Sequence, residues 1–211
     1  MITGVPLHIV DHPLVQDALA ELRDVRTRPP AFRRAANRIS VLLAAEALRD
    51  IPAAAATVTT PLGPAEGRVV QTDVVVVPVL RAGLGMLDAI LELLPDARVG
   101  HIGLQRDEAT AIAARYYSKL PPGLAGSYVL MIDPMLATGG SAVAAIDLLK
   151  AAGAQTIRMI CIVAAPEGVS LVSRHHPDVI VYAPVIDREL NAHKLIVPGL
   201  GAFGDRLYGT D

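Results

Sequence analysis

The chain has 211 residues, of which 52% are hydrophobic, and a formal net charge of −2. This length and composition predict one well-cored α/β domain and exclude a disordered chain, while the balanced charge argues against binding to nucleic acid or a membrane surface through bulk charge. The single cysteine, Cys161, excludes a disulfide framework. The N-terminus lacks a secretory signal, and the apolar runs are shorter than the about 20 residues that a membrane span needs, so we expect a cytoplasmic protein.

Two amphipathic helices are predicted near the N-terminus, each started by proline. The first spans residues 13–26, and its expected apolar face comprises Leu14, Ala18, Leu22 and Val25. The second follows Pro29, and its expected apolar face comprises Phe32, Ala36, Ile39 and Leu43. Seven arginines lie between Arg23 and Arg49, which we interpret as a solvated face or an oligomer contact, with an RNA- or nucleotide-binding patch as the alternative.

Residues 57–67 predict a short strand that breaks into a turn. The core of a parallel sheet is predicted to begin at residues 74–80, where uninterrupted β-branched residues indicate a strand buried on both faces. Pro78 indicates that this strand ends, or lies at an edge, near that point. The loop at Arg81 then leads into a helix, and a short strand is predicted at residues 99–104.

Residues 128–153 predict a buried strand, a polar loop and an amphipathic helix. The strand ends at one carboxylate, Asp133, and the loop at residues 137–141 is rich in Gly, Thr and Ser. Such a loop aims several backbone N–H groups at one point, at the positive end of a helix dipole, and so predicts a phosphate site. The acid before it suits the hydroxyls of a ribose. A sugar phosphate is therefore the predicted ligand.

The other segments complete the predicted sheet. Residues 107–119 have two adjacent tyrosines and poor helical periodicity, so we interpret them as a mobile hairpin or lid. Strands are predicted at residues 156–164 and 179–183, with a helix at residues 170–175 between them. Residues 187–211 are rich in glycine, and we interpret them as a loop that covers something.

Three polar loops, at Arg81, Arg106 and Asp133, each follow a predicted strand. Loops after the strands of a parallel sheet gather at its carboxyl edge, where ligands bind. Taken singly, each arginine is more typical of an ordinary surface charge. At equivalent strand ends, however, two guanidinium groups and a phosphate loop predict a ligand with several phosphates, because guanidinium holds phosphate oxygens in pairs.

Other motifs do not indicate catalysis. Residues 199–204 match the dinucleotide pattern G-x-G-x-x-G, but they follow a proline near the C-terminus, so we interpret them as a loop whose backbone approaches a planar ligand. No lysine precedes Ser141, which excludes a Walker A motif. The histidines lack a third ligand at zinc spacing, and no Ser–His–Asp or carboxylate-pair signature is readable. We therefore expect chemistry without a protein nucleophile.

The segment Asp133-Pro134-Met135-Leu136-Ala137-Thr138-Gly139-Gly140-Ser141 resembles the phosphoribosyl diphosphate (PRPP) loop of the uracil phosphoribosyltransferases, which have the type I phosphoribosyltransferase fold. Most of the wider fold has two adjacent acids where this chain has Asp133-Pro134, so the match is narrow and informative. Further similarity runs along nearly the whole chain, at residues 11–14, 22–24, 46–50, 60–63, 78–86, 116–121, 165–168, 196–201 and 204–206.

The resemblance implies a Rossmann-like parallel sheet flanked by helices, with a C-terminal hood and a flexible lid hairpin. It implies one phosphoribosyltransferase domain over residues 1–211, with N-terminal helices at 13–50, a core at about 70–185 and a hood at about 186–211. The implied reaction converts uracil and PRPP to UMP and diphosphate in pyrimidine salvage, as a glycosyltransferase (pentosyltransferase). Mg²⁺ would arrive on PRPP, GTP would be a possible allosteric activator, and the protein would be a homodimer or larger homo-oligomer.

The resemblance also implies roles for individual residues. The implied catalytic residues are Asp133 and Arg106. Contacts with PRPP are implied for Arg81, Arg106, Asp133, Pro134, Met135, Leu136, Ala137, Thr138, Gly139, Gly140 and Ser141. Contacts with uracil, largely through backbone groups, are implied for Ile196, Gly201, Ala202 and Phe203. No metal ligand on the protein is implied, since Mg²⁺ is carried by PRPP.

The chain departs from the family pattern at Lys194 and Leu195, where the family usually has Gly-Tyr, and at Ala202 and Phe203. Ala202 replaces an acid that serves PRPP and its metal, and Phe203 replaces a small residue. We therefore hypothesise weakened activity or an altered base, with Phe203 crowding or reshaping the base site. The alternative from another class is a PRPP- or nucleotide-sensing pyrimidine regulator. Such regulators generally keep two acids in the PRPP loop, so Asp133-Pro134 favours the enzyme.

Overall fold

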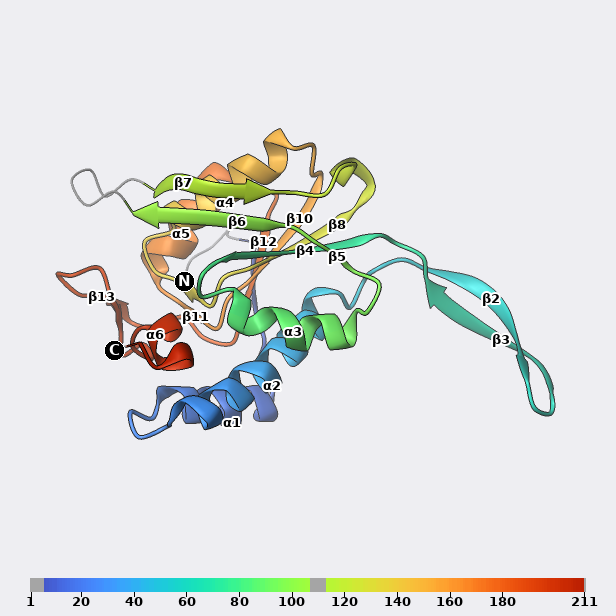
Figure 1. Cartoon of the computed structure of the whole chain (residues 1–211), viewed down its shortest axis with the longest axis horizontal. Coiled ribbons are helices and arrows are strands. Elements are labelled where there is room, and N and C mark those ends of the chain that lie inside the picture. Colours follow the sequence, from blue (N-terminus) through green and yellow to red (C-terminus); the bar gives the residue numbers. More distant parts are fainter. Residues whose placement is uncertain (1–5, 107–112, 211) are drawn as a thin grey trace.

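The computed structural model describes residues 6–106 and 113–210. Its centre is an eight-stranded sheet in the order β1-β12-β10-β8-β4-β6-β7, with β5 paired to β4 (Figure 1). The strands are β1 (Leu7–Ile9), β4 (Val74–Leu80), β5 (Arg98–Val99), β6 (His101–Arg106), β7 (Ala113–Lys119), β8 (Tyr128–Ile132), β10 (Thr156–Ile160) and β12 (Ile180–Ala183). Only the pairing of β6 with β7 is antiparallel among these described strands, so the prediction of a parallel α/β sheet is confirmed.

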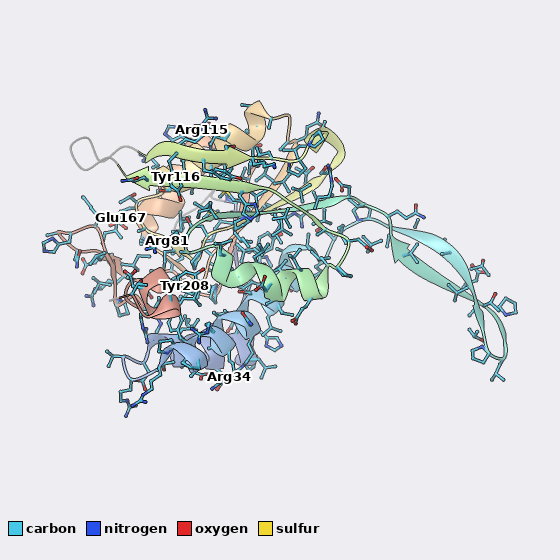
Figure 2. All side chains as sticks on the ribbon, in the orientation of Figure 1. Arg34, Arg81, Arg115, Tyr116, Glu167 and Tyr208 are labelled. Carbon is cyan, nitrogen blue, oxygen red and sulfur yellow. The ribbon has the colours of Figure 1, made fainter. Side chains whose placement is uncertain are left out.

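Helices cover both faces of the sheet, and side chains fill the space between the layers (Figures 1 and 2). One face carries α1 (Pro13–Arg23), α2 (Pro29–Ala47) and α3 (Leu84–Leu93), and the other carries α4 (Gly140–Ala151) and α5 (Pro166–His175). The side chains of β4 alternate between the two cores, since Val74 and Val76 pack with the first set and Val75 and Val77 with the second. This period of two, with apolar residues at every position, explains why β4 is a central strand.

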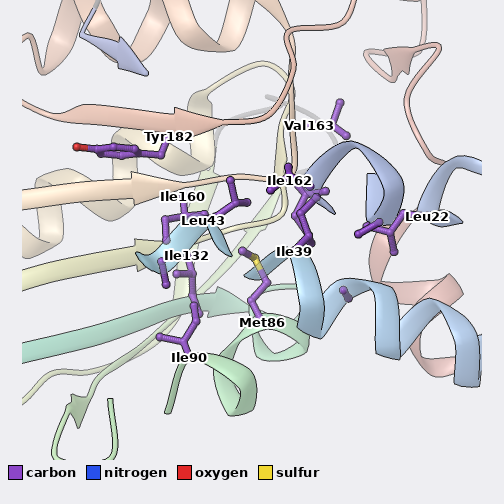
Figure 3. Packing of buried hydrophobic residues seen from close by; sticks show 14 of the residues in the cluster. Leu22, Ile39, Leu43, Met86, Ile90, Ile132, Ile160, Ile162, Val163 and Tyr182 are labelled. Carbon is purple, nitrogen blue, oxygen red and sulfur yellow. The ribbon is translucent and has the colours of Figure 1, made fainter. Parts of the chain in front are cut away.

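The core beneath α1–α3, part of which is drawn in Figure 3, also includes residues of the C-terminal segment. Phe32, Ile39 and Leu43 of α2 are fully buried, as their helical spacing predicts. Truncating one such side chain to alanine costs about 2–5 kcal/mol. The same core includes two residues of the C-terminal helix α6 (Phe203–Tyr208), so α2 carries the segment that borders the carboxyl edge of the sheet.

The first helix is shorter than predicted and buries a different face. It ends at Arg23, because Asp24 has an extended backbone (φ −63°, ψ 118°) and its carboxylate accepts the Arg26 N–H. The buried face comprises Val15, Ala18, Leu19 and Leu22. Leu14 and Val25 are 56% and 89% exposed, so the prediction that they line the core is wrong. The true stripe follows i, i+3, i+4 and i+7 from a start one residue later.

Several other bounds differ from prediction. Residues 57–67 belong to a hairpin of β2 (Ala53–Thr60) and β3 (Gly63–Val70), which projects from the body of the molecule (Figure 1). The predicted strand at 156–164 divides into β10 and β11 (Val163–Ala164), because the N–H groups of Ile162 and Val163 both turn to the Pro134 carbonyl. The predicted helix at 170–175 begins earlier, at the first residue of α5.

Pro78 and the shortest elements show the effect of tertiary pairing. Pro78 lies inside a central strand, between the parts of β4 that pair with β5 and with β6, where its missing N–H is tolerated.

The remaining short elements are two strand pairs and a 3₁₀ turn (Leu124–Gly126). In these pairs β9 (Met135–Leu136) lies beside β11, and β13 (Glu189–Leu190) lies beside β14 (Ile196–Val197). Two-residue strands have no periodicity that a sequence could display.

Candidate active site

The loops at Arg81 and Asp133 meet at the carboxyl edge of the sheet. They follow β4 and β8, which are paired neighbours. A Cβ atom built on Gly83 would lie 2.6 Å from the Ile132 carbonyl oxygen, so the turn after β4 touches the end of β8 and admits only glycine there. The turn that carries Arg81 and the strand end that carries Asp133 are therefore neighbours at this edge.

The loop between β8 and α4 is shaped to hold a small anion. It lines a cavity of about 90 Å³ formed by Asp133, Met135, Leu136, Ala137, Thr138, Gly139, Ser141 and Ala142. Gly139 precedes α4 in the left-handed region (φ 86°) and supplies no side-chain cap. The first helical bond is that of the Val143 N–H to Gly139, so the preceding N–H groups are available to a ligand at the positive end of the helix.

This loop packs directly against the first turn of α5. A Cβ atom on Gly139 would lie 2.8 Å from the Gly168 carbonyl oxygen, and one on Gly168 would lie 2.5 Å from the Ala137 carbonyl oxygen. Both positions therefore require glycine. Reasoning from the sequence placed Gly168 in a family motif without a role, and its role is to let α5 support the anion loop.

Asp133 stands at the mouth of the anion loop. The residue is half-buried and lines the cavity, and its carboxyl accepts the Met135 N–H at 3.4 Å. Desolvation of the carboxyl raises the pKa of Asp133 to about 7, and the bond from Met135 offsets it only in part. A ligand whose hydroxyl groups donate hydrogen bonds to this carboxylate would favour its charged form.

Arg81 points from the edge toward the hood, which we define as residues 186–210 (Figure 2). Its side chain is 66% exposed, and its Nη2 lies 3.7 Å from Oδ1 of Asp205 in α6. The helix after Arg81 also touches α6, since a Cβ atom on Gly85 would lie 2.4 Å from the Leu207 side chain. The arginine turn and the hood are therefore adjacent.

The β6–β7 hairpin extends beyond this edge. β6 pairs with β4 up to Gly103 and continues to Arg106, whose backbone pairs with β7. The antiparallel partner of β6 is therefore β7, which is the second part of the segment predicted as a hairpin or lid, while residues 107–112 and the side chain of Arg106 lie outside the described part of the chain. The ring of Tyr116 covers the backbone of Gly103, where a Cβ atom would lie 2.6 Å from the ring. The role of Arg106 and the movement of the lid remain predictions.

The hood contributes a tight turn between β14 and α6. Gly199 and Gly201 have positive φ angles of 61° and 80°, and a Cβ atom on Gly199 would lie 2.4 Å from the Ile196 carbonyl oxygen. Ile196 is buried, whereas Gly201 and Ala202 are exposed. The turn therefore presents mainly backbone, as the glycine pattern predicts, and uracil contacts at these residues remain predictions.

The structure corrects the expectation for Phe203. Its side chain is 2% exposed and meets the Phe32 ring edge-on, with ring centroids 5.2 Å apart and an interplanar angle of 62°. The side chain does not crowd the base site, because the first turn of α6 directs it into the core, whereas an effect of Phe203 on the shape of that site stays a prediction. Ala202, the departure beside it, occupies the N-cap position of α6 without a side-chain bond.

The arginine-rich N-terminal helices contain the groups that reasoning from the sequence missed. Four of the seven arginines in residues 23–49 form ion pairs with carboxylates, namely Arg23, Arg26, Arg38 and Arg49. Arg23 reaches Asp187 and the Gly199 turn, and Arg33 donates to the Leu207 carbonyl. The only signal for these roles was the presence of Arg23 in a family motif, because their partners lie at the other end of the chain.

Some features are absent from the described residues, 6–106 and 113–210. They hold no cluster of three or more His, Cys, Asp or Glu side chains placed to bind a metal. Within the same ranges, none of the helices combines the length and the apolar character of a membrane span. Cys161 is buried beneath Asp133, and burial together with that carboxylate raises the pKa of its thiol, as expected of an unreactive core cysteine.

Comparison with known proteins connects this site to one family. The family model for uracil phosphoribosyltransferase matches residues 9–210. The chain is 51% identical over 203 residues to a uracil phosphoribosyltransferase of Dictyoglomus thermophilum, covering 96% of this chain and 98% of that protein. It is 50% identical over 203 residues to one of Thermus thermophilus, covering 96% and 98%.

Solved structures show the same fold. The AQ2163 protein of Aquifex aeolicus superposes with a TM-score of 0.92 at 33% identity, covering 97% of this chain and 99% of that one. An adenine phosphoribosyltransferase of Leishmania donovani superposes with a TM-score of 0.58 at 14% identity, covering 92% and 89%, which indicates a shared fold alone. The fold is that of the type I phosphoribosyltransferases.

Proposed function

The chain belongs to the uracil phosphoribosyltransferase family, and we propose that it converts uracil and PRPP to UMP and diphosphate in pyrimidine salvage. The observation that carries this proposal is the anion loop at residues 137–141 beside Asp133 and Arg81, at the edge of the sheet. One phosphate, a sugar with hydroxyl groups and a second anionic group fit these three elements in turn.

In the proposed reaction the bond between C1 of the ribose and diphosphate breaks as N1 of uracil bonds to C1 and loses its proton. The anion loop would hold the 5′-phosphate, and Asp133 would accept hydrogen bonds from the ribose hydroxyls. Arg81 would stabilise the departing diphosphate, and Arg106 would reach PRPP from the hairpin. Alignment and stabilisation of developing charge supply most of the rate enhancement in such sites. Closure of the hairpin would exclude water.

We propose that Mg²⁺ enters with PRPP. In the described residues the carboxylates near the site, Asp133 and Asp205, stand singly, which suits an ion that arrives with phosphate oxygens and water as ligands. When bound, the ion neutralises charge on the diphosphate. Ala202 removes a further carboxylate that the family places in the hood, so we expect weaker binding of Mg²⁺–PRPP than in relatives that keep the acid.

Three further properties of the family extend to this chain as proposals. We propose a homodimer or larger homo-oligomer, activation by GTP and cytoplasmic residence. A buried free cysteine is compatible with a reducing compartment. The single domain over residues 1–211, with its hood, is likewise proposed from the resemblance.

The direct test is the formation of UMP from uracil and PRPP with Mg²⁺. We expect UMP with uracil, and much less product with cytosine or with a purine base. Asp133→Asn, which removes only the charge, should abolish most of the activity. Absence of UMP formation in the wild-type protein would reject the assignment, and unchanged UMP formation in Asp133→Asn would reject the role of Asp133.

A further inference from the structure

The buried pair of Arg23 and Asp187 holds both backbone groups of Gly199. Arg23 donates from Nη2 to Asp187 Oδ1 at 2.6 Å and from Nη1 to Oδ2 at 3.0 Å. The same Nη1 donates to the Gly199 carbonyl at 2.9 Å, and Asp187 Oδ2 accepts the Gly199 N–H at 2.8 Å. One guanidinium and one carboxylate thus fix the two peptide groups that flank Gly199.

The pair is well placed to resist movement. The side chain of Asp187 is 4% exposed and that of Arg23 is 24% exposed, so water competes weakly for these bonds. Two parallel N–H···O bonds of a guanidinium also fix orientation, which a lysine cannot do. Asp187 is anchored in turn, because its N–H donates to the Ala164 carbonyl at 2.8 Å and Ala164 pairs with Leu136, the residue before the anion loop.

The turn itself leaves few alternative positions for the backbone that follows. Gly199 is in the left-handed region against the Ile196 carbonyl, and Leu200 is 3% exposed. The exposed backbone at Gly201 and Ala202 comes directly after these fixed residues. A shift of Gly199 would therefore move the groups that the proposed function assigns to uracil.

We propose that Arg23 and Asp187 are positioning residues for the base, which set uracil affinity and selectivity by fixing the turn at residues 199–201. The inference rests on the proposed function, because it assigns the base to this turn. Neither side chain need touch the base. Arg23 is the last residue of α1, and Asp187 lies in the segment after β12.

The test compares Arg23→Lys, Arg23→Met and Asp187→Asn with the control Arg33→Met. Arg33 also joins an N-terminal helix to the hood, through the Leu207 carbonyl at 2.8 Å, but it does not touch Gly199. In the first three variants we expect the KM for uracil to rise by about 10-fold or more, as when a group that orients a binding residue is lost, with the KM for PRPP changed less than about threefold. Arg33→Met should leave both constants near those of the wild type. Arg23→Lys keeps the charge and serves if Arg23→Met fails to fold.

Hydrogen exchange separates this inference from the proposed function. Amides of residues 196–203 should exchange faster in Arg23→Lys and Asp187→Asn than in the wild type, whatever base the protein uses. Failure of the wild type to form UMP would reject the proposed function and leave the exchange result to decide the role of the pair. Equal increases in both KM values, the same uracil effect in Arg33→Met, or unchanged exchange at residues 196–203 would each overturn the inference.

Discussion

The phosphate loop, residues 133–141, and the hood border one site but are held in different ways. The phosphate loop lies between β8 and α4 and packs on the first turn of α5, so one continuous stretch of chain from β8 to α5 determines its shape. The hood depends on hydrogen bonds from Arg23 to Asp187, Arg33 to Leu207 and Arg206 to Asp24, whose members are 164, 174 and 182 positions apart. The phosphate half of the site is therefore shaped by one continuous stretch of the chain, whereas the base half depends on contacts with the N-terminal helices.

The largest effect should come from disrupting the phosphate loop at Gly139. In Gly139→Ala the new methyl would meet the Gly168 carbonyl oxygen at 2.8 Å and the backbone would keep a positive φ of 86°. We expect kcat/KM for PRPP to fall by about 100-fold, because a displacement near 1 Å costs that much in an aligned site. Steady-state kinetics at saturating uracil would measure the loss.

Gly153→Ala is the matched control. Gly153 ends α4 with a positive φ of 95°, but no atom lies within 4 Å of an added Cβ. This variant should lose about 1–2 kcal/mol of stability through the left-handed conformation and keep its activity. Equal activity losses in the two variants would show that the contact with α5 is not what shapes the loop.

The next largest effect should come from Asp133→Asn, which we expect to lower the activity and to raise the stability of the folded protein. Burial raises the pKa of Asp133 to about 7, so the folded protein binds a proton more readily than the unfolded chain. The free energy of unfolding of the wild type should then fall as the pH rises from about 4 to about 7 through this group. An uncharged amide removes that dependence, and its stabilising effect should be present at pH 8 and absent at pH 4.

Thermal unfolding at pH 4 and pH 8 would measure this prediction, beside kcat/KM at pH 8. We expect Asp133→Asn to be more stable than the wild type at pH 8 by on the order of 1–2 kcal/mol, and less active by about 100-fold, as for other lost charge-stabilising groups. A variant that is less stable than the wild type at pH 8 would contradict the desolvated carboxyl.

The same contrast explains what could be predicted from the sequence. The run at residues 74–80 and the strand–loop–helix at 128–153 carry their structure in local periodicity and glycine positions, so their elements and the anion loop were predictable. The helix at 29–47 was predictable for the same reason. The burial of Phe203 was not, because its partner Phe32 is 171 positions away and no local pattern signals the contact.

The site divides along the same line. The adjacency of Arg81 and Asp133 follows from the rule that loops gather at the carboxyl edge of a parallel sheet. The roles of Arg23 and Asp187 could not be read, since an arginine at the end of a surface helix resembles any solvated charge until its partner is placed. Short pairings such as that of β9 with β11 are likewise decided by neighbours, not by their own residues.

A smaller effect should sharpen the link between the two halves at Asp205. Its carboxylate lies 3.7 Å from Arg81 and accepts the Thr210 hydroxyl at 2.8 Å. In Asp205→Asn we expect the KM for PRPP to change by about three- to tenfold, with stability changed by less than about 1 kcal/mol because exposed pairs contribute little. Thr210→Val removes the other partner and should leave the KM unchanged. The same KM change in both variants would indicate a general loosening of α6.

The smallest effect should come from Ala202→Asp, which restores the acid of the family pattern. Ala202 has the extended backbone of an N-cap (φ −75°, ψ 103°), so an aspartate there would accept N–H groups of α6 and add about 0.5–2 kcal/mol of stability. Thermal unfolding should show a rise of a few degrees. Phe203 must stay, because Phe203→Ala would remove a core side chain at a cost of about 3–5 kcal/mol and obscure the result. A lower KM for PRPP at limiting Mg²⁺ would add a role in binding the metal complex, whereas a gain in stability alone would assign the acid to the cap.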